Sequence, residues 1–128
     1  MKPKISVIIP CYNSENFITR CAQSLINQTI GIENLELIFI NDGSTDNTLI
    51  KLNELETLFP NNIMVIDLGE NLKQGTARNI GIQYANADYI GFVDSDDWIE
   101  ESMYEKLYMI MQQYNCDIVG CCLMVDLD

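Results

Sequence analysis

Three carboxylates stand within four residues at Asp94, Asp96 and Asp97, directly after the apolar run Tyr89 to Val93, which reads as a buried strand. Carboxylates packed this closely repel one another unless a positive group lies among them. Mg²⁺ and Mn²⁺ prefer oxygen ligands, so a divalent cation with a phosphorylated ligand would relieve the repulsion. A solvated acidic turn that caps the next helix is the simpler interpretation, and it is favoured for an isolated Asp-x-Asp. The rest of the chain favours the cation.

The composition indicates one folded domain and excludes several classes of partner. The chain has 128 residues, 48% of them hydrophobic, as is typical of a globular chain with a single core. Its net charge of −12 argues against nucleic acid or an anionic membrane surface as partner. The longest apolar runs, such as 35–40, are far shorter than the roughly 20 residues that cross a bilayer, so we expect no transmembrane segment.

The cysteine pattern and the lack of histidine narrow the chemistry further. The five cysteines include no Cys-x-x-Cys pair, which fits neither a disulfide framework nor a zinc site. With no histidine in the sequence, Ser-His and Cys-His catalysis are excluded. We therefore expect a reducing, cytoplasmic compartment, with a peripheral position at the inner face of the membrane as the alternative for the full-length protein.

Apolar strands alternate with amphipathic helices along the chain. The expected strands are 5–9, 35–40, 63–66, 89–93 and 117–125. The helices between them are expected to turn these residues inward: Phe17, Cys21, Leu25; Leu49, Leu52, Glu56, Phe59; Ala77, Ile80, Gly81, Tyr84; Met103, Leu107, Ile110, Tyr114. This alternation predicts an α/β fold with a mostly parallel sheet covered by helices on both faces. No linker or repeat divides the chain, so we expect a single domain over residues 1–128.

Polar motifs follow four of the predicted strands. They are Tyr12-Asn13, Asn41-Asp42, Gly69-Glu70-Asn71 and Asp94-Ser95-Asp96. In an open α/β sheet, ligands bind in the crevice outside the carboxyl ends of the strands. We therefore expect the four motifs to meet at one edge of the sheet and to serve one ligand.

Several side chains suit a nucleotide-sugar, although each has a structural alternative. Asp42 could accept a hydrogen bond from a base or ribose, or act only as a turn residue. Arg78 could pair with a phosphate or with the clustered carboxylates, or form an ordinary surface ion pair. Gly75 leaves room for close backbone approach at a helix start, whose free N–H groups attract anions. Tyr12 could stack on a base or cover the sheet end, and we expect Trp98 to pack under the acidic loop.

Four motifs in series resemble the family 2 glycosyltransferases. They are Pro10-Cys11-Tyr12-Asn13, Asn41-Asp42-Gly43-Ser44-Thr45-Asp46, Gly75-Thr76-Ala77-Arg78-Asn79-Ile80-Gly81 and Asp94-Ser95-Asp96-Asp97-Trp98. Each motif is weak alone, whereas the four in this order and spacing are highly specific. The resemblance covers about residues 4–125 and implies the GT-A fold, a Rossmann-like nucleotide-binding domain.

The resemblance also implies roles for individual residues. Asp42 would hold the uracil of a UDP-sugar, while Asp96, together with Asp94, would bind Mn²⁺ or Mg²⁺ at the diphosphate. The residues implied to bind the nucleotide-sugar are Pro10, Tyr12, Asn13, Asp42, Asn71, Gly75, Arg78, Asp94 and Ser95. Asp97 would support the loop or cap the next helix. The sugar would pass, with inversion at its anomeric carbon, to a hydroxyl of a glycan or lipid-linked acceptor in polysaccharide or glycan synthesis.

An inverting transferase needs a general base for the acceptor hydroxyl. In the family this Asp or Glu lies well downstream of the acidic motif, so the catalytic residue is unknown here and is expected beyond residue 128. We therefore interpret the chain as the N-terminal donor-binding part of a longer enzyme. Such a piece is expected to bind nucleotide weakly and to transfer little or no sugar.

Other functions stay open beside the transferase. A non-catalytic, transferase-like domain would bind nucleotide or a partner without turnover. A metal-dependent phosphotransferase also uses paired aspartates, but in the haloacid-dehalogenase-like case they follow the first strand. A response-regulator receiver would need its phosphoacceptor Asp after the third strand. A nucleotidyltransferase would need a Gly-rich basic loop where Pro10-Cys11-Tyr12-Asn13 stands.

Overall fold

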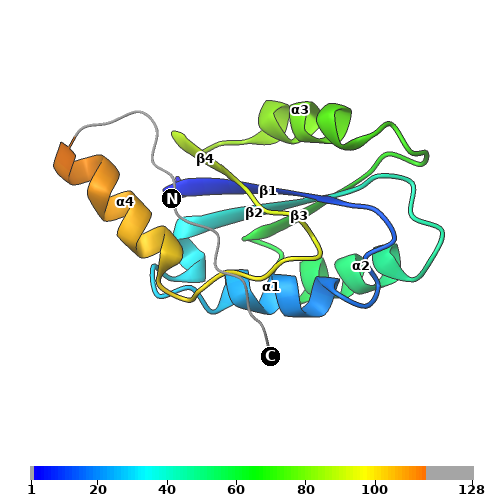
Figure 1. Ribbon diagram of the computed structural model, residues 1–128, viewed down its shortest axis with the longest axis horizontal. Coiled ribbons are helices and arrows are strands. Elements are labelled where there is room, and N and C mark those ends of the chain that lie inside the picture. Colours follow the sequence, from blue (N-terminus) through cyan, green and yellow to red (C-terminus); the bar gives the residue numbers. More distant parts are fainter. Residues whose placement is uncertain (1, 115–128) are drawn as a thin grey trace.

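A computed structural model describes residues 2–114 of the protein. Strands and helices alternate along these residues, as predicted (Figure 1). The strands are β1 (Ile5–Cys11), β2 (Leu35–Asn41), β3 (Ile63–Asp67) and β4 (Tyr89–Phe92). The helices are α1 (Ile18–Ile26), α2 (Thr48–Leu58), α3 (Gln74–Tyr84) and α4 (Met103–Tyr114), and a 3₁₀ turn, η1 (Ile32–Asn34), precedes β2. The fifth strand predicted at 117–125 lies outside the described residues.

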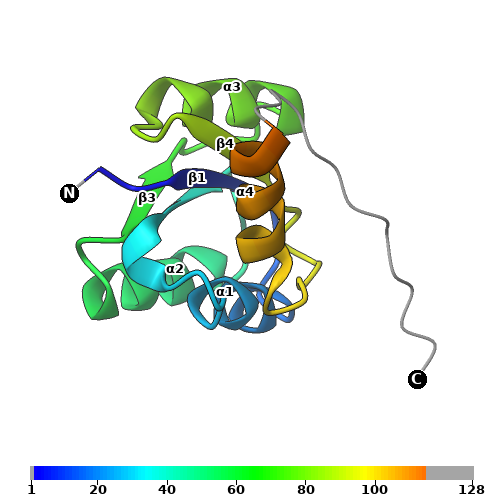
Figure 2. The ribbon, with the colours of Figure 1, turned by 90° about the vertical axis from the view of Figure 1, so that its left-hand side faces the viewer.

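The strands form one parallel sheet in the order β3-β2-β1-β4. Chain order runs outward from β1 to β3 and then returns to the other side of β1, where β4 pairs with it. Helix α3 lies on one face of the sheet, and α1 and α2 lie on the other (Figure 1 and Figure 2). The predicted α/β class and the cover on both faces are therefore confirmed. The reversal between β1 and β4 opens the kind of crevice in which α/β sheets bind ligands.

The two central strands are buried on both faces because helices cover them from both sides. The cluster on the α1 and α2 face includes Val7, Ile9, Phe39, Leu25 and Leu52, and the cluster on the α3 face consists of Ile8, Ile38, Ile40 and Ala77. Burying one such aliphatic or aromatic side chain stabilises the fold by roughly 1.5–3 kcal/mol. This double cover explains why β1 and β2 read as unbroken apolar runs.

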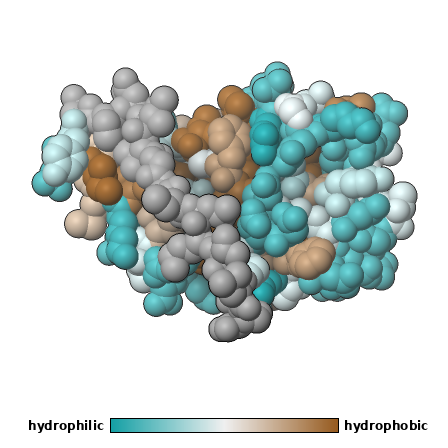
Figure 3. All heavy atoms as spheres, viewed as in Figure 1, coloured by the Kyte–Doolittle hydropathy of each residue, from teal (hydrophilic) through white to brown (hydrophobic). Residues whose placement is uncertain are grey.

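The prediction that the run 89–93 is a buried strand is only partly right. Tyr89 is partly buried and Val93 is buried, but Ile90 is 40% and Phe92 is 49% exposed. Ile90 and Phe92 lie on the α3 face, where α3 packs against β1 and β2. Because α3 does not extend over β4, these two side chains remain at the surface, where apolar residues gather over β4 (Figure 3).

Four residues predicted to face inward from helices are exposed instead: Phe17, Tyr84, Ile110 and Tyr114. Phe17 occupies the N-cap position before α1 rather than its inner face, which carries Ile18 and Cys21. Tyr84 and Tyr114 are the last residues of their helices. The periodicity therefore predicted the right helices but counted end residues of α1, α3 and α4 as core. Ile110 is a separate case, because it lies within α4 and is 40% exposed.

Gly81 allows α3 to approach the sheet closely. A Cβ at this position would lie 2.6 Å from Ile8 Cγ2 and 2.7 Å from Ile40 Cδ1, both on the central strands. Gly75, in the first turn of the same helix, has open space where a Cβ would stand. The two glycines thus differ in packing although they share a helix.

We expect Gly81→Val to lower the free energy of unfolding by about 1–3 kcal/mol, because the added side chain overpacks the α3 interface. Gly75→Ala is the matched control. Alanine is the better helix former and meets no neighbour, so this variant should be as stable as the wild type or more so. Urea denaturation of the three proteins checks both expectations. Equal midpoints for Gly81→Val and the wild type would contradict the close approach of α3.

Candidate functional site

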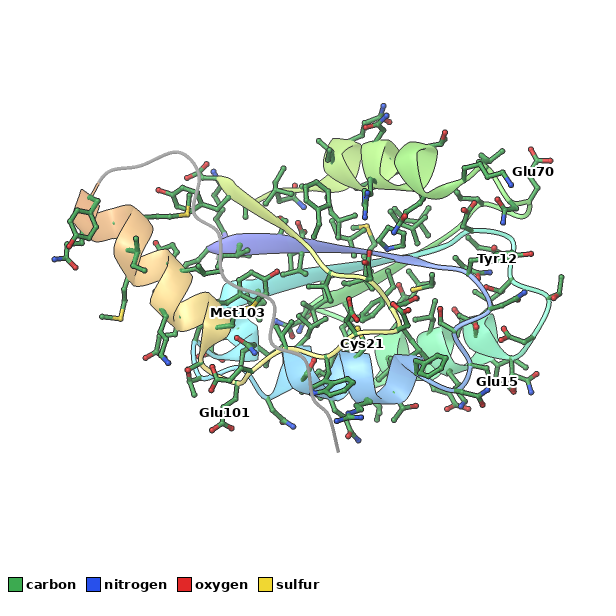
Figure 4. The ribbon with its side chains drawn as sticks, viewed as in Figure 1. Tyr12, Glu15, Cys21, Glu70, Glu101 and Met103 are labelled. Atoms are coloured by element: carbon green, nitrogen blue, oxygen red, sulfur yellow. The ribbon has the colours of Figure 1, made fainter. Side chains whose placement is uncertain are left out.

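A cavity of about 510 Å³ lies at the carboxyl ends of the strands, where the loops after β1, β2 and β4 meet the start of α3. Tyr12 and Glu70, from two of the four predicted motifs, lie at the same end of the molecule (Figure 4). The cavity is lined by Pro10, Cys11, Tyr12, Asn13, Ser14, Phe17, Asp42, Asn71, Lys73, Gln74, Asp94, Ser95 and Asp96. All predicted site residues line it except Gly75 and Arg78, which lie on α3.

Asp42 has a structural role in its loop and also lines the cavity. Its side chain is almost completely buried, and Oδ1 accepts a hydrogen bond of 2.6 Å from the Leu72 backbone N–H. This contact ties the end of β2 to the loop that leads into α3. A carboxylate has lone pairs for several hydrogen bonds, so Asp42 can also accept one from a ligand in the cavity that it lines. Tyr12, half-exposed, lines the same cavity.

Asn13 and Asn71 shape the loops on which they lie. Asn13 has a positive φ of 49°, a conformation that asparagine tolerates. Its Oδ1 accepts from the Thr45 N–H at 2.8 Å, and its own N–H donates to Ser44 Oγ at 3.0 Å. Asn71 Oδ1 accepts from the Lys73 N–H at 3.0 Å. The Asn13 side chain therefore joins the loops after β1 and β2, whereas that of Asn71 stabilises its own loop, and both residues line the cavity.

The acidic residues after β4 form a cluster of three. One carboxylate oxygen from each of Asp94, Asp96 and Asp97 lies within 4.8 Å of the others, and all three side chains are accessible to solvent. Burial and then the charges of Asp96 and Asp94 raise the pKa of Asp97 above its ordinary value. Mutual repulsion of the three groups therefore persists in the folded chain.

Asp97 supports its loop, as predicted, and its side chain also belongs to the acidic cluster. Its backbone N–H donates to the Asp94 carbonyl at 3.0 Å, which supports the loop as expected. It does not cap the next helix, because α4 begins only at Met103. Its side chain instead lies in the cluster, as the crowding of three carboxylates in the sequence indicated, although the family resemblance implied a metal role only for Asp96 and Asp94.

Arg78 pairs with the cluster, one of its three predicted alternatives. Its Nη2 lies 3.3 Å from Asp94 Oδ1, which also accepts from Gln74 Nε2 at 2.9 Å. Within residues 2–114, Arg78 is the one cationic side chain in a salt bridge with the cluster. One guanidinium cannot balance three carboxylates. The oxygens and their spacing fit a hard divalent ion such as Mg²⁺ or Mn²⁺.

Two further predicted residues are placed differently from the expectation. Ser95 lines the cavity, but its side chain is mostly buried and Oγ hydrogen-bonds to Ser14 Oγ. Trp98 does not line the cavity; it is 43% exposed, and its ring lies against Arg20, with the guanidinium carbon 3.2 Å from the ring centroid. Trp98 therefore packs against Arg20 of α1.

Sequence reasoning missed several residues that line the cavity. Lys73 and Gln74 open α3, and Lys73 has a strained backbone with φ of 75°. The sequence did predict a helix start with free N–H groups at Gly75, and this could have indicated that the residues just before it, Lys73 and Gln74, lie near a bound anion. Phe17 was assigned to the core because it shares the helical period of Cys21 and Leu25, and Ser14 carried no signal of its own.

Comparison with known proteins identifies the family. The sequence profile described as "Glycosyl transferase family 2" matches residues 6–128. The chain belongs to glycosyl transferase family 2. Glycosyltransferase GlyA of Streptococcus pneumoniae serotype 4 (strain ATCC BAA-334 / TIGR4) is 41% identical over 115 residues, which cover 90% of this chain and 16% of that protein. The poly(ribitol-phosphate) beta-glucosyltransferase of Bacillus spizizenii (strain ATCC 23059 / NRRL B-14472 / W23) is 38% identical, over 90% of this chain and 18% of its own length.

Solved structures support the same family. S. aureus TarS 1-349 in complex with UDP-GlcNAc superimposes with a TM-score of 0.78 and 32% identity, over 88% of this chain and 32% of that one. This match confirms the predicted GT-A fold, and the acidic cluster after β4 excludes the haloacid-dehalogenase-like arrangement. The chain spans a small part of the relatives it matches. Within residues 2–114, no helix is both long and apolar enough to cross a membrane.

Gly43 brings the Asp42 turn against the loop before α3. It has a φ of +74°, and an added Cβ would lie 2.5 Å from the carbonyl carbon of Glu70 and closer still to the Asn71 nitrogen. Gly69 has a similar φ of +77°, but a Cβ there would meet nothing within 4 Å. The two glycines thus share the backbone requirement and differ only in the contact.

We expect Gly43→Ala to destabilise the protein more than Gly69→Ala. Both changes place alanine in the left-handed region, at a cost of roughly 1–2 kcal/mol, but only Gly43→Ala also forces two backbone segments apart. Chemical denaturation of both variants gives the difference. If the two lose the same stability, the close contact between the loops is not a constraint on the site.

Proposed function

We propose that this chain is the donor-binding part of an inverting glycosyltransferase that holds a UDP-sugar, with Mn²⁺ or Mg²⁺, in the strand-end cavity. The observation that carries the proposal is that Asp42 and Tyr12 open to the same cavity as Asp94 and Asp96. A nucleotide-sugar needs these two regions together, one for its base and ribose and one for its diphosphate. The complex of TarS with UDP-GlcNAc, at 32% identity, supports this class of donor.

The base and ribose belong to the half of the cavity between β1 and β2. Tyr12 offers an exposed ring for stacking, and Pro10 lines the wall beside it. Asp42 can accept a hydrogen bond from the uracil N–H, which favours uracil over a base that presents an acceptor there. Asn71 lines the same cavity on the loop that Asp42 holds in place.

The diphosphate belongs to the half of the cavity between Asp96 and the start of α3. The carboxylates of Asp94, Asp96 and Asp97 would hold the metal ion, which when bound would offset the charge that builds on the departing nucleoside diphosphate. Lys73 lies at the same wall, and the first N–H groups of α3 are free to meet phosphate oxygens. Gly75 presents no side chain that would block them. Arg78 keeps Asp94 directed toward this region.

The acceptor and the general base belong to other parts of the full protein in this proposal. We assign the base to no residue of 2–114 and keep the expectation that it lies beyond residue 128. The acceptor would be a glycan or a lipid-linked glycan. Relatives named for poly(ribitol-phosphate) glucosylation and for minor teichoic acid biosynthesis, at 38% and 41% identity, favour a cell-surface polymer as the product.

We expect UDP to raise the melting temperature of the chain only when Mn²⁺ is present, and this metal-dependent shift to vanish in Asp96→Ala. UDP at 100 times its dissociation constant would stabilise the folded state by about 2.7 kcal/mol. Asp88→Ala is the matched control, since Asp88 is an exposed aspartate whose partner is Lys2. It should respond to UDP and Mn²⁺ as the wild type does.

Thermal-shift titration of the three proteins with UDP, Mn²⁺ and both together makes this measurement. Equal stabilisation by UDP with and without Mn²⁺ would contradict the metal site. A wild-type response in Asp96→Ala would show that Asp96 is not a ligand. No response to UDP under either condition would contradict the donor-binding function itself.

A further inference from the structure

The acidic loop between β4 and α4, residues 93–102, contains no helix or strand. Its backbone groups therefore lack the regular hydrogen-bond pattern of a helix or sheet. Val93 N–H donates to the Ile8 carbonyl and Asp97 N–H to the Asp94 carbonyl, and other buried groups need partners from elsewhere in the fold. The loop also carries three carboxylates that repel one another, with Arg78 as their counter-charge. An unsupported loop of this kind would open and move the carboxylates apart.

Side chains of α1 supply the missing partners. The Cys21 thiol lies 3.7 Å from the Asp94 carbonyl and donates to it. One turn further along, Ser24 Oγ accepts from the Ile99 N–H at 3.1 Å. Cys21 lies beneath the loop that follows β4 (Figure 4).

Gln28, just past the end of α1, holds the far end of the loop. Its side chain is 3% exposed, and all its polar atoms are used. Nε2 donates to the Glu100 carbonyl at 2.8 Å and to the Ser24 carbonyl at 3.0 Å, while Oε1 accepts from the Tyr104 N–H at 3.0 Å. Gln28 therefore connects α1, the acidic loop and the first turn of α4.

Ser14 holds the near end of the loop from the β1 side. Its hydroxyl hydrogen-bonds to Ser95 Oγ between the two metal-site aspartates. Its backbone N–H donates to Thr48 Oγ1 at 2.9 Å, which links it to the start of α2. Ser14 is almost completely buried, so this contact is shielded from water. The loops after β1, β2 and β4 are joined at this point.

We propose that Ser14, Cys21, Ser24 and Gln28 form a loop clamp that keeps Asp94, Asp96 and Asp97 converged before a metal ion binds. The inference rests on the proposed function, since it takes these aspartates as the metal site. The clamp residues touch the loop rather than the ion, and so they are positioning residues. Their hydrogen bonds resist the repulsion between the carboxylates. The loop is therefore ordered when the chain folds, and metal binding does not have to bear the entropy cost of ordering it.

The experiment removes the clamp without emptying the space it fills. Gln28→Met keeps most of the side-chain volume and loses three hydrogen bonds, and Ser14→Ala removes only the contact from its hydroxyl to Ser95 and Tyr12. Ser6→Ala is the control, because Ser6 is a completely buried serine that hydrogen-bonds to Glu36 and Ala87, in the first half of β1. An effect that comes only from a less stable folded chain should therefore appear in Ser6→Ala as well.

Two readouts are needed. The first is the affinity for Mn²⁺ at saturating UDP, followed by the electron paramagnetic resonance signal of free Mn²⁺. Loss of such outer partners weakens metal binding by about 10–100-fold, and we expect at least the lower figure in both clamp variants and no change in Ser6→Ala. The second is hydrogen exchange of the amides of 95–100 without metal, which should become faster in the clamp variants only.

Wild-type Mn²⁺ affinity and wild-type exchange in folded Gln28→Met and Ser14→Ala would overturn the clamp. If Gln28→Met does not fold, Ser14→Ala decides the question by the same two readouts. A wild-type chain that binds no Mn²⁺ would contradict the proposed function instead. In that case the exchange rates still decide whether these residues order the loop.

Discussion

Repulsion among the carboxylates of Asp94, Asp96 and Asp97 is the constraint that the rest of this structure accommodates. Three negative groups lie within 4.8 Å of one another, opposite one paired guanidinium from Arg78. Such an arrangement has no advantage for stability, so the fold supplies hydrogen bonds from α1 and from the loop after β1 to maintain it. A site that is unfavourable when empty is suited to bind a cation strongly, because the ion relieves the repulsion.

The topology brings this strained cluster to a nucleotide-sized cavity. Strand β4 returns to pair with β1 after the chain has moved outward to β3, so the loops after β1 and β4 diverge and leave a crevice between them. At the end of β2, Asp42 and Gly43 contact the loop that leads into α3 and so bring that loop to the cavity. The base region and the acidic region thus face one cavity although Tyr12 and Asp42 precede Asp94 by 82 and 52 residues in the sequence.

The parts of the site that sequence could predict are those with local signals. Asp42 and Asp94 each follow an apolar strand, and parallel strands bring their carboxyl ends together whatever the details of packing. The clamp carried no such signal, because Ser14 and Gln28 meet residues 81 and 72 positions away, and only the folded chain shows the pairing. Phe17 was misplaced for a related reason: periodicity does not reveal which residue begins a helix.

In the proposed function, one cavity holds both the nucleotide and a metal ion on the aspartates after β4. The most direct test is a crystal structure of the chain with UDP and Mn²⁺, with diffraction recorded at the manganese absorption edge. We expect one strong anomalous peak within coordinating distance of Asp96 and Asp94, beside the diphosphate, with the uracil between Tyr12 and Asp42. UDP bound in the cavity with no anomalous peak at these aspartates, or UDP bound elsewhere, would contradict it.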